Sequence, residues 1–306
     1  MNSELYFIGI DGGGTNCRVT LQDKNGAQLG EGISGPANIM RDGELAKTSI
    51  MDGVNKAIAS ANAFLASQSS DATVKPITAS QCIVGAGLAG ANITSAKARF
   101  ESWDHPFHSL FVLSDLHAAC VGAHNGKPGA VIIVGTGSAG AVFAEGKFTD
   151  VGGHGFPIGD VASGAWLGLK AIQHTLLCID NIRSPDVLAK QVCEALGTTN
   201  ADDIVAKCAG FSTHHYASLV PCMLPLLQKA NDGVVRIFKE GAEYLEAMAQ
   251  QLLGENTYNL ALIGGLSKVY VPYLSEKIRA HVQACELLPQ QGAIKYAKAV
   301  YNERWS

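Results

Sequence analysis

The chain has little charge, and it lacks the basic runs and the long apolar runs that accompany binding to nucleic acids and membranes. Only 16% of its 306 residues are charged, and the formal net charge is −4. This balance argues against a nucleic acid or an anionic membrane surface as a main partner. The longest uncharged stretches, 76–96 and 208–228, contain proline and hydroxyl residues, so neither is expected to span a membrane.

The sequence also lacks the features of secretion and of a common metal site. Its first residues, Met-Asn-Ser-Glu-Leu, show neither the basic region nor the apolar core of a signal peptide, so a cytoplasmic location is expected. Eight cysteines are scattered without a Cys-x-x-Cys pair. Buried free thiols are therefore favoured over a structural zinc site. The length and the 47% hydrophobic content suit a globular enzyme of two domains.

A glycine loop lies between two strand-like runs near the start. The apolar run 5–10 leads into Asp11, then Gly12-Gly13-Gly14-Thr15-Asn16, and residues 17–21 alternate again like a strand. A P-loop or a dinucleotide fingerprint would open a helix, so neither is present. Glycine turns offer N–H groups to phosphate, and a neighbouring aspartate requires Mg²⁺ to offset the repulsion. A magnesium–nucleotide loop and a plain hairpin turn both fit this stretch alone.

A second copy of the pattern favours the phosphate loop. The apolar run 130–134 leads into Gly135-Thr136-Gly137-Ser138, and residues 139–144 continue as a strand. Two such units predict a duplicated domain whose phosphate loops face each other across a cleft. A third glycine turn, which contains Gly264, Gly265 and Leu266, follows the buried strand 260–263.

Three polar residues elsewhere are candidates for ligand binding, each with a plain structural alternative. Asp115 follows the buried strand 109–113, where it suits either a ligand at the sheet edge or the N-cap of the next helix. Asn38 ends a loop rich in glycine and proline, and is either a sugar ligand or a turn residue. Asp160 lies in the glycine-rich segment 152–168, ahead of a helix that it could also cap.

Three motifs carry a resemblance to a known family. Ile-Asp-Gly-Gly-Gly-Thr at 10–15, Gly-Thr-Gly-Ser at 135–138 and Gly-Gly-Leu-Ser at 264–267 resemble the phosphate and adenosine motifs of actin-like ATPases. Within that superfamily the chain is similar to the BadF/BadG/BcrA/BcrD-type ATPases, the branch with bacterial glucosamine kinases and N-acetylglucosamine kinases. The resemblance implies an α/β fold of two actin-like (ribonuclease H-like) domains, with duplicated mixed sheets flanked by helices and a cleft between them.

The expected domains are 1–114, an N-terminal actin-like ATPase domain, and 115–306, its C-terminal counterpart. The second domain carries a mostly helical insertion over about 162–253. The last helix, about 292–302, is a candidate to pack back on the N-terminal domain.

The resemblance also implies a role for each candidate residue. Asp115 would be the catalytic base, and Asp11 would hold Mg²⁺ through water. The residues implied to bind ATP are Gly12, Gly13, Gly14, Thr15, Asn16, Gly135, Thr136, Gly137, Gly264, Gly265 and Leu266. Those implied to hold the sugar are Asn38, Ser138, Gly153, His154 and Asp160. The predicted reaction is ATP- and Mg²⁺-dependent phosphorylation of the 6-hydroxyl of glucosamine.

Two other activities stay open. N-acetylglucosamine is the alternative substrate, although the mammalian kinases for that sugar carry asparagine, tryptophan and glutamate where this chain has Ala139, His154 and Val161. The remoter alternative is an iron–sulfur ATPase that activates a 2-hydroxyacyl-CoA dehydratase or a benzoyl-CoA reductase. The expected partners are an amino sugar and ATP, and a homodimer is the family expectation.

Overall fold

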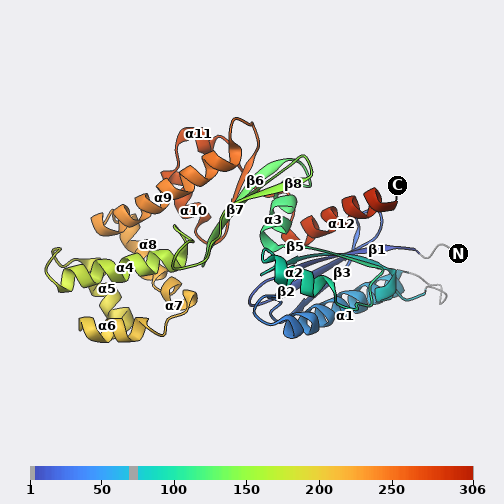
Figure 1. Ribbon diagram of the computed structural model, residues 1–306, viewed down its shortest axis with the longest axis horizontal. Coiled ribbons are helices and arrows are strands. Elements are labelled where there is room, and N and C mark those ends of the chain that lie inside the picture. The colour runs from blue at the N-terminus through green and yellow to red at the C-terminus, as the bar shows by residue number, and fades with distance from the viewer. Residues whose placement is uncertain (1–3, 69–74, 306) are drawn as a thin grey trace. The chain divides into compact units, whose positions relative to one another are not determined.

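The computed structural model describes residues 4–68 and 75–305, which form two compact units (Figure 1). The first unit comprises Met1–Gly129, Phe143–Phe148 and Ala284–Ser306, and the second comprises Ala130–Val142 and Thr149–Gln283. The first unit therefore extends past residue 114, where the sequence placed the domain boundary. It also takes up the end of the chain.

The first unit is built on a mixed sheet in the order β3-β2-β1-β4-β5. Its strands are β1 (Tyr6–Gly12), β2 (Cys17–Gln22), β3 (Gln28–Ser34), β4 (Cys82–Leu88) and β5 (Ser109–Ser114). The first three pair antiparallel, whereas β1, β4 and β5 pair in parallel. Gly12 is in register with Leu88, and Leu88 with Ser114. This register places Asp11 and Asp115 at the carboxyl ends of the parallel strands β1 and β5, which lie two strand spacings or roughly 10 Å apart.

Two long helices, α1 (Gly43–Gln68) and α12 (Pro289–Trp305), cover opposite faces of this sheet (Figure 1). Strand glycines allow the close approach, since a Cβ at Gly9 or Gly85 would overlap the backbone of α12. A Cβ at Gly30 or Gly32 would overlap the backbone of α1. The shorter helices are α2 (Thr94–Glu101) and α3 (Asp115–Ala123), and a 3₁₀ turn, η1, spans Ala79–Gln81. α12 packs against β1, β4 and α3, which accounts for the membership of α3 in the first unit.

The second unit repeats the strand order of the first. Its sheet runs β10-β9-β6-β7-β8, so β6, β7 and β8 take the places of β1, β2 and β3. The strands are β6 (Gly129–Val134), β7 (Ser138–Ala144), β8 (Lys147–Gly152), β9 (Leu260–Ile263) and β10 (Val282–Gln283), of which Gly129 and the β7–β8 turn, Phe143–Phe148, count with the first unit. In the first sheet the central strand β1 pairs in parallel with β4, which follows a helix in sequence. In the second sheet the central strand β6 likewise pairs in parallel with β9, which follows the helices α4 (Gly164–Ile179) to α9 (Asp232–Leu253). The predicted fold class, α/β with a duplicated mixed sheet flanked by helices, is confirmed.

Helices fill most of the remainder of the second unit. They are α4 (Gly164–Ile179), α5 (Val187–Leu196), α6 (Ala201–Cys208), α7 (Thr213–Ala217), α8 (Val220–Gln228), α9 (Asp232–Leu253), α10 (Ser267–Tyr270) and α11 (Glu276–Arg279), with a 3₁₀ turn, η2, at Val271–Tyr273. They enclose one large apolar core with the sheet. Over the described part of the chain, none of the helices combines the length and the apolarity needed to cross a bilayer.

Candidate functional site

The first glycine loop connects β1 to β2 and is anchored to two other loops. Gly13 N–H donates to Asn16 O at 2.9 Å, and Gly13 O accepts from Ala37 N–H at 2.9 Å. Gly12 O accepts from Ala89 N–H at 2.8 Å. Residues 14–16 are exposed at the tip of the turn. The loop is thus fixed at its base and open at its tip, as a phosphate-binding turn must be.

Asp11 lies at the end of β1, directly across from Arg18 on β2. The two side chains form an ion pair of 3.7 Å, with the aspartate 19% exposed. Burial raises the pKa of Asp11, the charge of Asp115 raises it further, and Arg18 opposes the shift. A buried carboxylate whose charge is only partly offset by its neighbours suits a hard cation such as Mg²⁺.

Asp115 is the first residue of α3, but it is not the cap of that helix. The N-cap is Ser114, whose hydroxyl accepts from His117 N–H at 3.1 Å. Asp115 Oδ1 accepts from Leu116 N–H at 2.9 Å. Burial raises the pKa of Asp115 despite that hydrogen bond. The capping alternative is therefore wrong, and the aspartate is a buried carboxylate at the carboxyl edge of the sheet.

Asn38 performs the turn role that was its structural alternative. Its side-chain oxygen accepts from Met40 N–H at 3.1 Å and from Arg41 N–H at 2.9 Å. A Cβ at Gly90 would lie 3.0 Å from the same oxygen, so the loop after β4 passes close by. Within the described residues the amide nitrogen of Asn38 donates no hydrogen bond. That donor remains available to a ligand.

The second glycine loop, 135–138, covers the start of α4. Gly135 N–H donates to Gly137 O at 2.9 Å, while Gly135 O accepts from Gly164 N–H at 2.7 Å. Thr136 O accepts from Ala165 N–H at 3.2 Å. The first N–H groups of α4 are thus already hydrogen-bonded to the loop. A ligand in this region would therefore meet the backbone of the loop and not the N-terminus of α4.

Ser138 differs from its expected role. Its side chain is only 3% exposed, and its hydroxyl donates to Val161 O at 2.7 Å. The hydroxyl therefore ties the phosphate-type loop to the segment 152–163 and does not point toward a ligand. It acts as a positioning group for both loops.

Asp160 joins the same two loops through its carboxylate. Oδ1 accepts from Gly155 N–H at 3.2 Å, and Oδ2 would lie 2.8 Å from a Cβ at Gly137. Burial raises the pKa of Asp160. The cap of α4 is Ser163, whose hydroxyl accepts from Trp166 N–H at 3.2 Å, so a capping role for Asp160 is wrong. Its backbone has φ +58°, a left-handed conformation that aspartate and asparagine tolerate better than most residues.

Gly153 and His154 belong to the same loop as Asp160. Gly153 has φ +70°, and a Cβ there would lie 3.0 Å from the Cβ of Ala139. His154 is exposed, and its charge favours the ionised form of Asp160. The predicted sugar residues of this unit therefore gather around one carboxylate.

The third glycine turn follows β9, which pairs in parallel with β6. Gly264 has φ +101°, and a Cβ there would overlap Val134 O. Leu266 N–H donates to that same oxygen at 3.1 Å, and the leucine side chain is 6% exposed within the core. The turn thus lies beside the 135–138 loop. Leu266 offers only its main chain to a ligand.

Tyr244 of α9 is a further residue beside this loop, outside the predicted set. A Cβ at Gly152 would lie 2.8 Å from its hydroxyl oxygen. Burial raises the pKa of Tyr244, and the charge of Asp160 raises it further. No local motif marks this tyrosine, because it reaches the glycine-rich loop only through the packing of α9.

Comparisons with known proteins agree with these motifs. The chain is 32% identical over 292 residues to the glucosamine kinase GspK of Vibrio cholerae, with 95% of each chain covered. It is 29% identical to the N-acetyl-D-glucosamine kinase of Dictyostelium discoideum over 67% of this chain and 64% of that protein.

Solved structures show the same relationship. A protein from Chromobacterium violaceum, named as an N-acetylglucosamine kinase, superposes with a TM-score of 0.83 at 27% identity, covering 96% of this chain and 99% of that one. A ROK hexokinase from Thermus thermophilus shares the fold at a TM-score of 0.55 and 16% identity, covering 98% and 100%. The model of the BadF/BadG/BcrA/BcrD ATPase family matches residues 8–294, a range that contains every candidate residue described above, and the chain belongs to this family.

Proposed function

We propose that this protein is an ATP-dependent amino-sugar kinase that phosphorylates the 6-hydroxyl of glucosamine, with N-acetylglucosamine as the alternative substrate. The supporting observation is that each glycine motif contains an open glycine: Gly14, Gly135 and Gly265. Apart from the two chain neighbours, no described residue has an atom within 4 Å of a Cβ built at any of the three, and none has a left-handed φ. Neither packing nor backbone conformation requires glycine there, whereas close approach of a nucleotide to the backbone does.

The nucleotide would be bound by backbone groups of the three motifs. Residues 12–16 and 135–137 would contact the phosphates, and residues 264–266 the adenosine. Asp11 would hold Mg²⁺ through water, because its buried carboxylate is only partly offset by Arg18. When bound, Mg²⁺ neutralises charge on the phosphates.

Asp115 would act as the base. The 6-oxygen of the sugar forms a bond to the γ-phosphorus, the bond from that phosphorus to the bridging oxygen breaks, and ADP leaves. The hydroxyl proton passes to the carboxylate of Asp115. Burial raises the pKa of this carboxyl, which brings a general base closer to the pH at which it works.

The sugar would be held by Asp160, His154, the backbone of Gly153 and the free amide of Asn38. Asp160→Asn is expected to raise the KM for the sugar roughly tenfold or more, since a hydrogen bond to a charged group contributes about 1.5–3 kcal/mol. Asparagine tolerates the left-handed backbone and keeps an oxygen for Gly155 N–H, so the loop should stay in place. Initial rates at varied sugar and at varied ATP measure this effect.

The matched control for this prediction is Asp202→Asn, which alters an exposed aspartate in the first turn of α6. Both KM values should be unchanged in the control. An unchanged sugar KM in Asp160→Asn would remove Asp160 from the sugar site.

The substrate is tested by ADP release from ATP and Mg²⁺ with glucosamine, N-acetylglucosamine, mannosamine and glucose. We expect glucosamine to give the highest kcat/KM, at least about tenfold above glucose, a difference of about 1.4 kcal/mol. At Ala139, His154 and Val161 the chain differs from the mammalian N-acetylglucosamine kinases, and these differences favour glucosamine over N-acetylglucosamine as the substrate. Absence of sugar-stimulated ADP release would contradict the kinase proposal.

A homodimer and a cytoplasmic location stay predictions.

The positions of the cysteines argue against the iron–sulfur activator. All eight lie in the described residues, and only Cys285 is exposed. A cluster shared by two subunits needs several thiolates that reach a common surface. One exposed thiol per chain does not supply them.

A further inference from the structure

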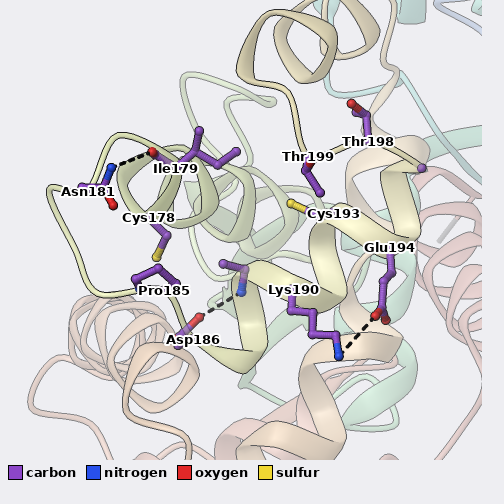
Figure 2. Close-up of a pocket in the computed structure, with 12 residues that line it drawn as sticks. Cys178, Ile179, Asn181, Pro185, Asp186, Lys190, Cys193, Glu194, Thr198 and Thr199 are labelled. Carbon is purple, nitrogen blue, oxygen red and sulfur yellow. Dashed lines mark hydrogen bonds and ion pairs between the residues drawn. The ribbon is translucent and has the colours of Figure 1, made fainter.

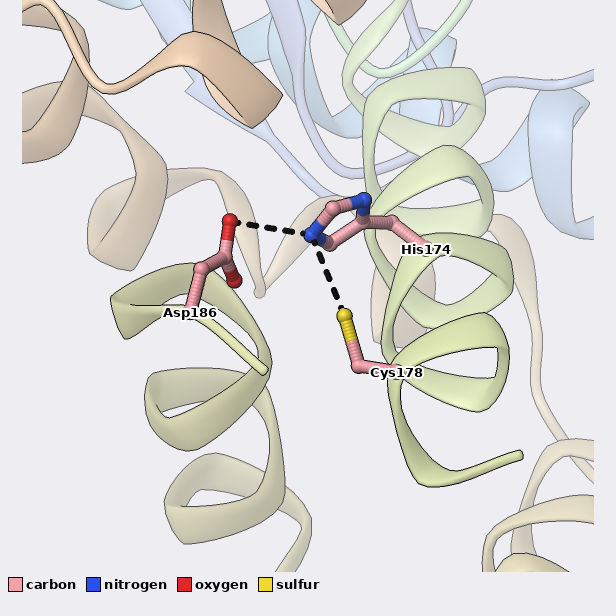
Figure 3. Close-up of side chains that lie close together, drawn as sticks. All are labelled: His174, Cys178 and Asp186. Atoms are coloured by element: carbon pink, nitrogen blue, oxygen red, sulfur yellow. Dashed lines mark hydrogen bonds and ion pairs between the residues drawn. The ribbon is translucent and has the colours of Figure 1, made fainter. Parts of the chain in front are cut away.

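Three side chains of the second unit converge outside the residues assigned to the kinase reaction. His174 and Cys178 lie one turn apart on α4, and Asp186 is the N-cap of α5 (Figure 3). His174 Nε2 is 3.0 Å from Asp186 Oδ2 and 3.6 Å from Cys178 Sγ. All three atoms lie within 4.8 Å of one another.

This geometry differs from a Cys–His–Asp catalytic triad. In a triad the carboxylate and the nucleophile contact opposite ring nitrogens of the histidine, whereas here both contact Nε2. The convergence of N, S and O on one point is instead the arrangement of a metal site.

We propose that this cluster binds a zinc-type divalent cation through His174 Nε2, Cys178 Sγ and Asp186 Oδ2. Imidazole, thiolate and carboxylate are the groups that tetrahedral Zn²⁺ takes. Bond lengths of about 2.3 Å to sulfur and about 2.0 Å to nitrogen place those two atoms about 3.5 Å apart in a tetrahedron. The observed 3.6 Å already matches this separation, so chiefly the carboxylate oxygen has to move.

The surroundings hold the three groups in place. Asp186 uses Oδ1 to accept from Ala189 N–H at 2.9 Å, which leaves Oδ2 for the cation. His174 is 6% exposed and Cys178 is 3% exposed. The thiol donates to Ser184 O at 3.4 Å, so its sulfur is fixed on the side that faces the loop between the two helices.

A groove that reaches Cys178 and Asp186, but not His174, is the proposed entry path for the cation and the proposed place of a fourth ligand. It has a volume of about 780 Å³, and Cys178 and Asp186 line it together with Lys190, Cys193 and Glu194 from α5 (Figure 2). Zinc sites with three protein ligands keep a water or another small ligand in the fourth position. The groove would supply that position from solvent.

Arg236 competes with the cation. Its Nη2 lies 3.3 Å from His174 Nδ1, so this guanidinium donates to Nδ1, and Nε2 carries the proton that it donates to Asp186. Binding of a cation at Nε2 shifts that proton to Nδ1 and requires Arg236 to turn away. Arg236 is exposed on α9, so it is able to do so.

The test uses Co²⁺ as a spectroscopic probe on the full chain, first treated with a chelator. We expect one equivalent per chain, with the near-ultraviolet absorption of a cobalt–thiolate bond. Cys178→Ser and His174→Gln should abolish that band, whereas Cys193→Ser, which removes the other thiol of the groove, should retain it. Arg236→Ala should tighten Co²⁺ binding severalfold.

The control readouts are stability and kinase turnover. Zn²⁺ should raise the Tm of the wild type and not of Cys178→Ser, while the metal-free Tm of each variant shows that it folds. His174 lies ten residues beyond the start of α4, about 15 Å along the helix, so turnover with Mg²⁺ alone should match the wild type. Absence of a stoichiometric band, or a band that survives Cys178→Ser, overturns the proposal.

Discussion

Asp115→Asn is expected to lower kcat by roughly 10²–10⁴ while the KM for ATP changes little, because a positioned general base contributes about that much. Asparagine keeps the oxygen that accepts from Leu116 N–H and removes only the ability to take up the proton. Steady-state ADP release with saturating sugar measures kcat, and nucleotide titration measures ATP binding. Unchanged turnover would exclude Asp115 as the base.

The same variant is expected to be more stable than the wild type at neutral pH. Burial raises the pKa of Asp115 in the folded protein above that of the unfolded chain. As pH rises through the window between the two pKa values, the unfolded chain ionises first, so this aspartate lowers the stability across that window and above it. Denaturant unfolding at pH 7 should therefore show a gain for Asp115→Asn that shrinks as the pH approaches about 4, the unfolded pKa.

Ser114→Ala gives the opposite pattern and serves as the control. It removes the cap of α3, which accepts from His117 N–H, and should cost about 1 kcal/mol of stability. Its effect on kcat should be far smaller than that of Asp115→Asn. A stability loss in both variants would contradict the assignment of the cap to Ser114 alone.

Gly135→Ala is expected to raise the KM for ATP roughly tenfold or more with no change in Tm. Apart from its two chain neighbours, no described residue has an atom within 4 Å of a Cβ built at Gly135, so the fold should accept the methyl group. A phosphate that approaches the backbone would not, and a loss of about 1.4 kcal/mol is tenfold in affinity. An unchanged KM would show that the loop does not bind the nucleotide.

Gly264→Ala is the matched comparison for Gly135→Ala, because it is expected to destabilise the fold. Its left-handed φ and its contact with Val134 O predict strain of about 1–3 kcal/mol in addition to overpacking. It should therefore lower the Tm clearly, which Gly135→Ala should not. Thermal unfolding of the two proteins side by side separates a glycine required by the fold from one required by a ligand.

The sequence predicts much of the fold because the strands and glycine turns are local signals. The runs at 17–22 and 130–134 alternate or stay apolar as strands do, and both form strands. The buried face of α1 follows from the sequence only in part. The apolar spacing over 43–67 predicts a helix that buries Leu45, Ile50, Val54, Ile58 and Phe64 or Leu65. Ile50 and Val54 are buried, but Leu45 and Phe64 are 45% and 46% exposed, while Ala57 and Ala61 are buried. Small residues face the sheet because α1 contacts Gly30 and Gly32 closely, a tertiary effect.

The site was predictable where motifs carry it and not where packing does. Asp11, Asp115 and the glycine loops follow from residues adjacent in sequence, whereas the Tyr244 hydroxyl comes beside Gly152, where the charge of Asp160 raises its pKa, only because α9 packs beside the loop. The spacing of cysteines in the sequence likewise did not predict the proposed cation site, because Asp186 comes close to His174 and Cys178 only through the connection between α4 and α5. Pro221 and Pro225 predict breaks in a helix over 213–229. The structure has one break there, between α7 and α8. Pro221 lies in the first turn of α8, where its missing N–H costs no hydrogen bond, and Pro225 lies inside α8.

In the proposed reaction the γ-phosphoryl group of ATP goes to the 6-hydroxyl of an amino sugar. The most direct measurement is a proton-coupled ³¹P spectrum of the products formed from ATP, Mg²⁺ and glucosamine. A phosphate ester on the 6-carbon couples to two protons and gives a triplet, which is the result we predict, together with the loss of the γ-phosphate signal. A doublet would place the phosphate on a ring hydroxyl, and a singlet of inorganic phosphate alone would contradict the kinase function.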